Sequence, residues 1–81
     1  MKFLSTPVEG AFQVEPTRHS DSRGFLARIF CERSFAEAGL DHRFVQINNS
    51  TSARKGTLRG LHYQVPPDTE AKLMRVVRGA I

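Results

Sequence analysis

Short runs in which apolar and polar residues alternate make up most of this chain. A period of two is typical of half-buried strands, and enrichment in aromatic and β-branched residues favours the same structure. Proline ends the first run at Pro16, and turn residues gather at 21–24 and 66–68. The pattern predicts an all-β fold, with strands over residues 11–15, 25–32, 44–48, 58–64 and 72–81.

One segment departs from this alternation. Ser34 and Glu37 have the S-x-x-E spacing of a capping box, in which the two side chains satisfy free amides at a helix start. Gly39 can adopt the left-handed conformation that ends a helix. These residues predict one short helix near residues 34–39.

The length of 81 residues leaves room for one small core, so we expect a single domain over residues 1–81. The last strand-like run reaches Ile81 without a turn, which suggests a chain cut within a larger β fold, or a strand that pairs with another subunit. Cys31 has no partner for a disulfide, and we interpret it as a small hydrophobic residue of a strand. Without a leader or a long apolar segment, we expect a soluble, cytoplasmic protein with no membrane partner.

The charge is +4, and arginine supplies most of the positive side chains. Arginine is suited to the planar, bidentate recognition of phosphate or carboxylate, so an anionic ligand is plausible. The arginines are scattered and form no basic run, and we therefore expect no nucleic-acid partner.

The candidate chemistry lies in two adjacent runs that hold Arg59, His62 and Lys72. Imidazole titrates near neutral pH, so His62 could remove a moderately acidic proton, such as one beside a ketone. Lys72 could then stabilise the negative charge that develops on the carbonyl oxygen. Arg59 and Arg23 could hold a phosphate or diphosphate. The plain alternative is that His62 is structural and that the charged residues are solvated.

Three further residues bear on the candidate site: Gln46 and Asn48 as possible ligand contacts, and Gln64 in the question of a metal site. Gln46 and Asn48 offer uncharged donors and acceptors for sugar hydroxyls or a base edge, or they simply support the next loop. Two metal ligands on one strand would read H-x-H, but Gln64 stands where the second histidine would be. We therefore expect no metal, and we interpret His19 and His42 as surface residues.

The chain resembles the N-terminal half of the dTDP-4-dehydrorhamnose 3,5-epimerase family. The resemblance rests on five segments in the family's order, of which R-G-L-H-x-Q is the most specific: residues 6–10, 21–25, 44–48, 58–64 and 72–79. It implies a partial cupin-like jelly roll, or double-stranded β-helix, and a homodimer whose N-terminal strands pair across subunits. It also implies an isomerase of dTDP-rhamnose biosynthesis that works without cofactor or metal.

The resemblance assigns roles to individual residues. The substrate would be dTDP-4-dehydro-6-deoxy-D-glucose, whose C4 ketone acidifies the protons at C3 and C5. His62 would be the general base, and Lys72 would stabilise the enolate. The remaining family positions would bind the substrate: Arg23 and Arg59 at the diphosphate, and Gln46 and Asn48 at the nucleotide sugar.

Two features depart from the family pattern. Leu26 stands where the family usually has an aromatic that packs on the base, and Arg28 where it has a glutamate that contacts the ligand. The family's tyrosine proton donor, and the aspartate that orients the histidine, belong to the second half. Two other functions therefore stay open: a truncated, non-catalytic protein that binds nucleotide sugars, and a small basic β-protein that binds nucleic acid.

Overall fold

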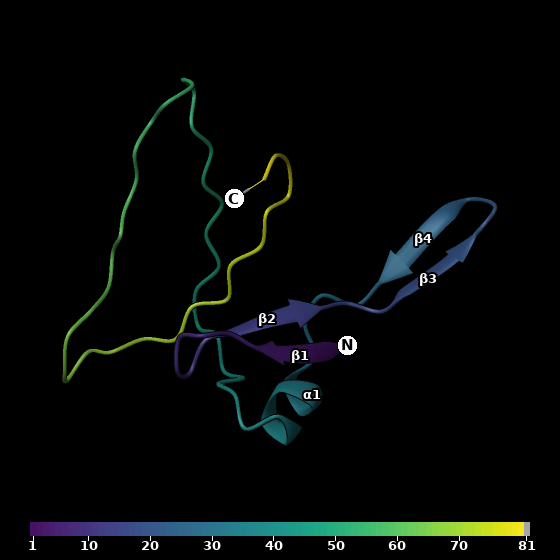
Figure 1. Cartoon of the computed structure of the whole chain (residues 1–81), viewed down its shortest axis with the longest axis horizontal. Coiled ribbons are helices and arrows are strands. Elements are labelled where there is room, and N and C mark those ends of the chain that lie inside the picture. Colours follow the sequence, from purple (N-terminus) through teal and green to yellow (C-terminus); the bar gives the residue numbers. More distant parts are fainter. Residues whose placement is uncertain (81) are drawn as a thin grey trace. The chain divides into compact units, whose positions relative to one another are not determined.

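The computed structural model describes residues 1–80, in two compact units that we describe separately, Met1–Gln46 and Ile47–Ile81. The first unit holds all the regular secondary structure of the described residues (Figure 1). Its elements are β1 (Lys2–Ser5), β2 (Phe12–Glu15), β3 (Arg18–Asp21), β4 (Gly24–Ala27) and α1 (Glu32–Glu37). Two small antiparallel sheets and one short helix agree with the predicted predominance of strands.

The first sheet is the hairpin of β1 and β2, in which Phe3 pairs with Val14. β2 confirms the strand predicted over residues 11–15, whereas the pattern did not reveal β1. The Thr6 hydroxyl organises the connecting loop, because it lies 3.1 Å from the Val8 carbonyl and 3.0 Å from the Ala11 carbonyl. One side chain therefore supports the whole loop.

The second sheet is the hairpin of β3 and β4. Asp21 pairs with Gly24, so the two residues between them form the turn that was predicted over 21–24. Gly24 has a φ of +131°, which side chains with a Cβ rarely adopt. The strand predicted over 25–32 is wrong in its second half, because β4 ends at Ala27 and a helix begins at Glu32.

The helix is present, but it covers Glu32–Glu37 rather than residues 34–39. Cys31 occupies the N-cap position, so Ser34 lies inside the first turn and the predicted capping box is not formed. The end of the helix confirms the role of Gly39, whose φ is +71°. The Gly39 amide donates to the Ala36 carbonyl at 3.0 Å and the Leu40 amide to the Phe35 carbonyl at 2.9 Å, the paired bonds of a Schellman motif.

Four phenylalanines form an aromatic cluster in the first unit. Phe35 on α1 is 3% exposed and lies at its centre. Its ring centroid is 5.1 Å from that of Phe3, 5.0 Å from that of Phe30 and 6.3 Å from that of Phe44. Each contact is edge to face, the arrangement that the aromatic quadrupole favours. This cluster joins the first hairpin to the helix.

The second unit has a different character. Over its described residues, 47–80, the structure contains neither helix nor strand. Ile47, Leu58 and Leu61 are 95%, 91% and 99% exposed. The strands predicted over 44–48, 58–64 and 72–81 are therefore wrong for this structure, with Ile81 lying outside the described residues. The turn predicted at 66–68 is present, since the Asp68 amide donates to the Val65 carbonyl at 3.0 Å.

The physical reason for this difference is that an alternating pattern gives a segment one apolar face but does not provide the neighbouring strand with which it must pair. A strand is stable only when a neighbouring strand satisfies its amides and carbonyls and something covers its apolar face. In β1 to β4 the hairpin partner follows within a few residues, whereas the described part of the second unit supplies no ladder.

Candidate functional site

Lys72 and His62, the two predicted catalytic residues, lie together in the second unit. The Lys72 ammonium donates to the main-chain carbonyl oxygen of His62 at 2.6 Å. It also forms an ion pair with Glu70, with 3.0 Å between Nζ and Oε1. The side chain of Lys72 is 41% exposed, so its charge stays accessible to a ligand. This contact places the Lys72 cation beside His62, although the two residues are ten positions apart in the sequence.

The His62 side chain remains exposed to solvent. Among the described residues, the hydrogen bond of His62 uses its main-chain carbonyl and leaves the imidazole unengaged. An imidazole in this state can accept a proton, and the neighbouring ammonium can face the oxygen of a carbonyl compound. The segment therefore holds an exposed imidazole and an ammonium that contacts the main chain of the same residue.

Arg59 is anchored by the loop that precedes it. Its Nε donates to the Ser52 hydroxyl at 3.1 Å, and its Nη2 donates to the Thr51 carbonyl at 3.1 Å. Guanidinium has five N–H donors, so three remain after these bonds. Arg59 can thus bind an anion while the loop holds its side chain in place.

Arg23 lies in the turn between β3 and β4 and is held by Asp21. The Asp21 carboxylate accepts from Arg23 Nη2 at 2.6 Å and from Nε at 3.2 Å, and it also accepts from the Arg23 amide at 2.8 Å. The bonds from the Arg23 side chain have the largest effect on the pKa of Asp21, which they lower, and the bond from the Arg23 amide lowers it further. The same ion pair raises the pKa of Arg23. Both side chains are exposed, at 87% for Arg23 and 52% for Asp21.

Gln46 and Asn48 lie in irregular backbone and are exposed. Gln46 is the last residue of the first unit, and Asn48 belongs to the second. The expectation that they share a strand is wrong for this structure, and their proposed contact with a ligand remains a prediction.

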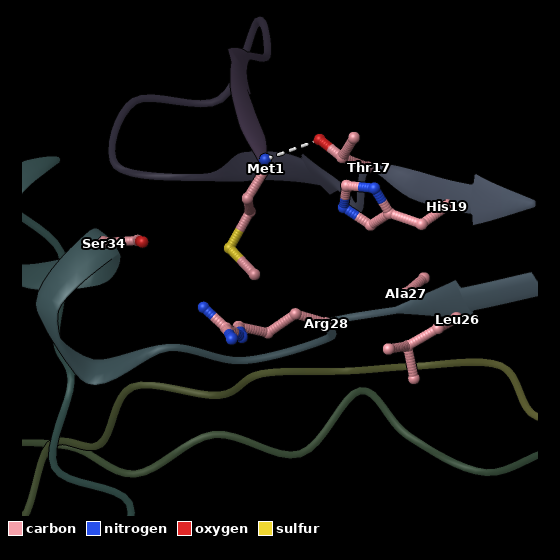
Figure 2. A pocket seen from close by; sticks show the side chains of 7 residues that line it. All are labelled: Met1, Thr17, His19, Leu26, Ala27, Arg28 and Ser34. Carbon is pink, nitrogen blue, oxygen red and sulfur yellow. Dashed lines mark hydrogen bonds between the residues drawn. The ribbon is translucent and has the colours of Figure 1, made fainter.

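A hollow of about 630 Å³ lies over the β3–β4 hairpin (Figure 2). Leu26 and Arg28, for which the resemblance predicted a departure from the family pattern, both line this hollow. A second hollow, of about 250 Å³, includes Asp21 and Arg23 and shares His19 and Leu26 with the first. The lining of the larger hollow consists of Met1, Thr17, His19, Leu26, Ala27, Arg28 and Ser34.

Cys31 is the N-cap of α1 rather than a strand residue. Its side chain makes no capping hydrogen bond, but the pKa of the thiol is lowered because Ser34 can donate to the thiolate, first from its hydroxyl and then from its amide. Weaker effects of Arg33 and Arg28 act in the same direction, while desolvation opposes them.

Several partners of the site residues escaped prediction. Glu70 next to Lys72 and Asp21 next to Arg23 are each two residues away from their cation, a spacing that strand alternation could have flagged as same-face pairs. The anchoring of Arg59 by Thr51 and Ser52 had no such signal, because it depends on how the loop folds back. His19 is exposed, as predicted for a surface residue, and it also lines both hollows.

Within the second unit, the predicted site residues are an exposed imidazole at His62, the Lys72 ammonium that contacts the same residue, and the anchored guanidinium of Arg59. The chain belongs to the dTDP-4-dehydrorhamnose 3,5-epimerase family, whose sequence model matches residues 5–81. No solved structure matches it significantly.

Individual relatives carry corresponding names. The dTDP-4-dehydrorhamnose 3,5-epimerase of Methanothermobacter thermautotrophicus is 46% identical over 80 residues, which are 99% of this chain and 42% of the relative. That of Sinorhizobium fredii is 38% identical over 81 residues, 100% of this chain and 42% of the relative. A dTDP-4-dehydro-6-deoxyglucose 3-epimerase of Streptomyces bikiniensis is 45% identical over 74 residues, 90% of this chain and 37% of the relative. The chain thus spans about two fifths of the length of these relatives.

Further observations concern membranes and metals. The structure has no helix, within residues 1–80, that is long and apolar enough to cross a membrane. Over the same residues, it gathers no group of three side chains suited to hold a metal ion.

Proposed function

We propose that this chain provides the base and the oxyanion-stabilising part of a dTDP-4-dehydrorhamnose 3,5-epimerase. The observation that carries the proposal is the 2.6 Å contact between the Lys72 ammonium and the His62 carbonyl, in a chain of this family. The contact brings the predicted oxyanion stabiliser to the predicted base.

The proposed reaction begins when His62 takes the proton from the carbon beside the C4 ketone. The C–H electron pair moves into a new carbon–carbon double bond, and the carbonyl electrons move to the C4 oxygen. Lys72 stabilises that oxygen as it becomes negative, which lowers the barrier to proton removal. Return of a proton to the opposite face then inverts the carbon, at C3 and at C5.

Four residues are proposed to bind the substrate. Arg23 and Arg59 would take the diphosphate, since each keeps N–H donors free beyond those used by Asp21 or by the loop. Gln46 and Asn48 would contact the nucleotide sugar through their amides. Their exposure is compatible with this role.

The proposal includes the family's architecture and setting. We infer that the strands of the first unit belong to a partial cupin-like jelly roll, that both units form a single domain, and that the active form is a cytoplasmic homodimer. The support is the family membership together with the exposed apolar side chains of the second unit, which a jelly roll or a second subunit would cover.

The test is the exchange of substrate protons in deuterium oxide. Incubation of the protein with dTDP-4-dehydro-6-deoxy-D-glucose should introduce deuterium at C3 and C5, and His62→Asn should abolish it. His42→Asn is the matched control and should leave exchange unchanged. Deuterium at C3 alone would instead indicate a 3-epimerase, and exchange that persists in His62→Asn would refute the assigned base.

Binding and turnover should separate in two further variants. Lys72→Ala should reduce exchange far more than affinity, whereas Arg59→Ala should weaken the binding of dTDP. Binding of dTDP without any exchange in the parent protein would favour the alternative, a non-catalytic nucleotide-sugar-binding protein. Equal loss of binding in both variants would contradict the division of roles.

A further inference from the structure

Glu70 is a charged residue in contact with the candidate site, and the proposed reaction gives it no role. Its carboxylate Oε1 lies 3.0 Å from the ammonium nitrogen of Lys72. The same ammonium donates to the His62 carbonyl at 2.6 Å. Glu70 therefore directly contacts the group that is proposed to stabilise the enolate oxygen.

This ion pair is the most shielded of those found in residues 1–80. The side chains of Lys72 and Glu70 are 41% and 40% exposed. In the other pairs the side chains of Arg23 and Arg33 are 87% and 86% exposed, and their carboxylate partners are 52% and 69% exposed. Because water screens charges less where it is partly excluded, the carboxylate of Glu70 restrains its cation more than the other two carboxylates restrain theirs.

The contacts of the Lys72 ammonium leave one direction open for a ligand. A lysine ammonium has three N–H donors. Over the described residues, one donor serves the His62 carbonyl and another the Glu70 carboxylate, so one remains. The lysine side chain is flexible, and two acceptors that hold its end fix where the third N–H points. A donor that is already oriented stabilises a developing oxyanion without rearranging during the reaction.

The carboxylate of Glu70 also has an opposing effect, because it offsets part of the positive charge of Lys72. An enolate oxygen bound to the third N–H would contact the ammonium directly, whereas the ammonium would separate it from the carboxylate. Coulomb energy falls with distance, and water still reaches both side chains, so the repulsion between the two anions is weaker than the direct bond. We therefore expect orientation of the ammonium to outweigh the loss of charge.

We infer that Glu70 is a positioning residue, which holds the Lys72 ammonium so that its third N–H donor is directed at the carbonyl oxygen of the substrate. The inference rests on the proposed function in taking this oxygen to be that of the C4 ketone. Glu70 transfers no proton and acts only through Lys72. The ligand group that matches one remaining N–H donor is a single oxygen acceptor.

The experiment compares Glu70→Ala with Glu70→Gln, which keeps an oxygen acceptor. Exchange of substrate protons in deuterium oxide gives kcat and KM, and NMR relaxation gives the mobility of the Lys72 ammonium. In Glu70→Ala, kcat should fall about fivefold to tenfold, the cost of one partly exposed hydrogen bond to a charged group, while KM stays within about twofold. Glu70→Gln should recover most of this loss. Glu37→Gln breaks the ion pair of α1 and should leave exchange unchanged.

The mobility of the ammonium separates this inference from the proposed function. Lys72 should be ordered in the parent and in Glu70→Gln, and mobile in Glu70→Ala. Unchanged or faster exchange in Glu70→Ala, equal losses in both variants of Glu70, or an ammonium as mobile in the parent as in Glu70→Ala would overturn the inference. Absence of exchange in the parent would contradict the epimerase function, and an ammonium that becomes mobile only in Glu70→Ala would still support its positioning by Glu70.

Discussion

The two units of this chain have similar sequence patterns and different structures. The first unit turns its alternating runs into two hairpins and packs a helix through Phe35. The second unit has equally apolar runs, but over residues 47–80 they form no ladder, and Leu61 is 99% exposed. The two units therefore do not differ in the alternation of their apolar and polar residues.

The difference lies in where each strand finds its partner. Asp21 and Gly24 close a two-residue turn, so β3 and β4 meet at a small entropic cost. In the second unit the contact between Lys72 and His62 spans ten residues and is made by one side chain rather than by main-chain pairing. The turn at 66–68 is formed, but the runs on either side of it make no main-chain ladder over residues 47–80, so a turn and an alternating pattern are not sufficient for a sheet.

The largest expected effect concerns the aromatic core of the first unit. Phe35→Ala removes a buried ring and leaves a cavity, which typically lowers the free energy of unfolding by about 3–5 kcal/mol. That loss would unfold most of so small a unit. Leu61→Ala, at an exposed position, should change it by about 0.5 kcal/mol or less. Thermal unfolding followed by circular dichroism measures both, and similar losses would remove the contrast between the units.

The next effect concerns the turn of the second hairpin. Gly24→Ala places a Cβ at a φ of +131°, and such strain costs on the order of 1–3 kcal/mol. Amides of β3 and β4 should then lose protection from hydrogen exchange, while those of β1 and β2 keep theirs. Gly56→Ala, at a φ of +79° in the second unit, is the matched control and should leave protection in both hairpins intact.

A smaller effect concerns the pH dependence of the Asp21–Arg23 pair. The pKa of Asp21 is lowered from its ordinary value of 3.8 by the Arg23 bonds, so the pair contributes stability above that value and loses it as pH falls through the lowered pKa. A carboxyl-detected NMR titration should give a pKa for Asp21 below 3.8. In Arg23→Gln this depression should shrink; an unchanged pKa would show that the pair does not hold the turn.

The smallest effects are those of the exposed ion pairs. Glu37→Gln breaks the contact with Arg33, whose atoms lie 3.6 Å apart, and should cost about 0.5 kcal/mol or less. Glu70→Gln should leave thermal stability unchanged while it shifts the NMR signal of the Lys72 ammonium, which keeps its bond to the His62 carbonyl. A large loss of stability in Glu70→Gln would mean that the second unit depends on this pair.

Much of the first unit could be read from local signals. Pro16 limited β2, residues 21–24 predicted the second turn, and Gly39 marked the end of the helix. The start of the helix was misplaced by two residues, because Ser34 offered a capping pattern that Cys31 replaces. β1 was missed, since its four residues show no distinctive pattern before they pair with β2.

The candidate site was predictable in its residue types and less so in its contacts. His62 and Lys72 were singled out from their chemistry, and the structure joins them through a main-chain carbonyl rather than through the imidazole. Arg59 was predicted to hold a phosphate or diphosphate, and its anchoring by Thr51 and Ser52 was not predicted. Such contacts depend on the path of a loop, which composition does not encode.

The sequence by itself determined the family, the residue types of the site and the turns, because motifs and backbone preferences act over a few neighbouring residues. Only the tertiary structure decided which runs became strands, that Phe35 packs against Phe3, and that Arg28 and His19 border one hollow. These features require groups distant along the chain to meet. The free energy of such tertiary contacts depends on packing and on loop closure, which are not properties of any single residue.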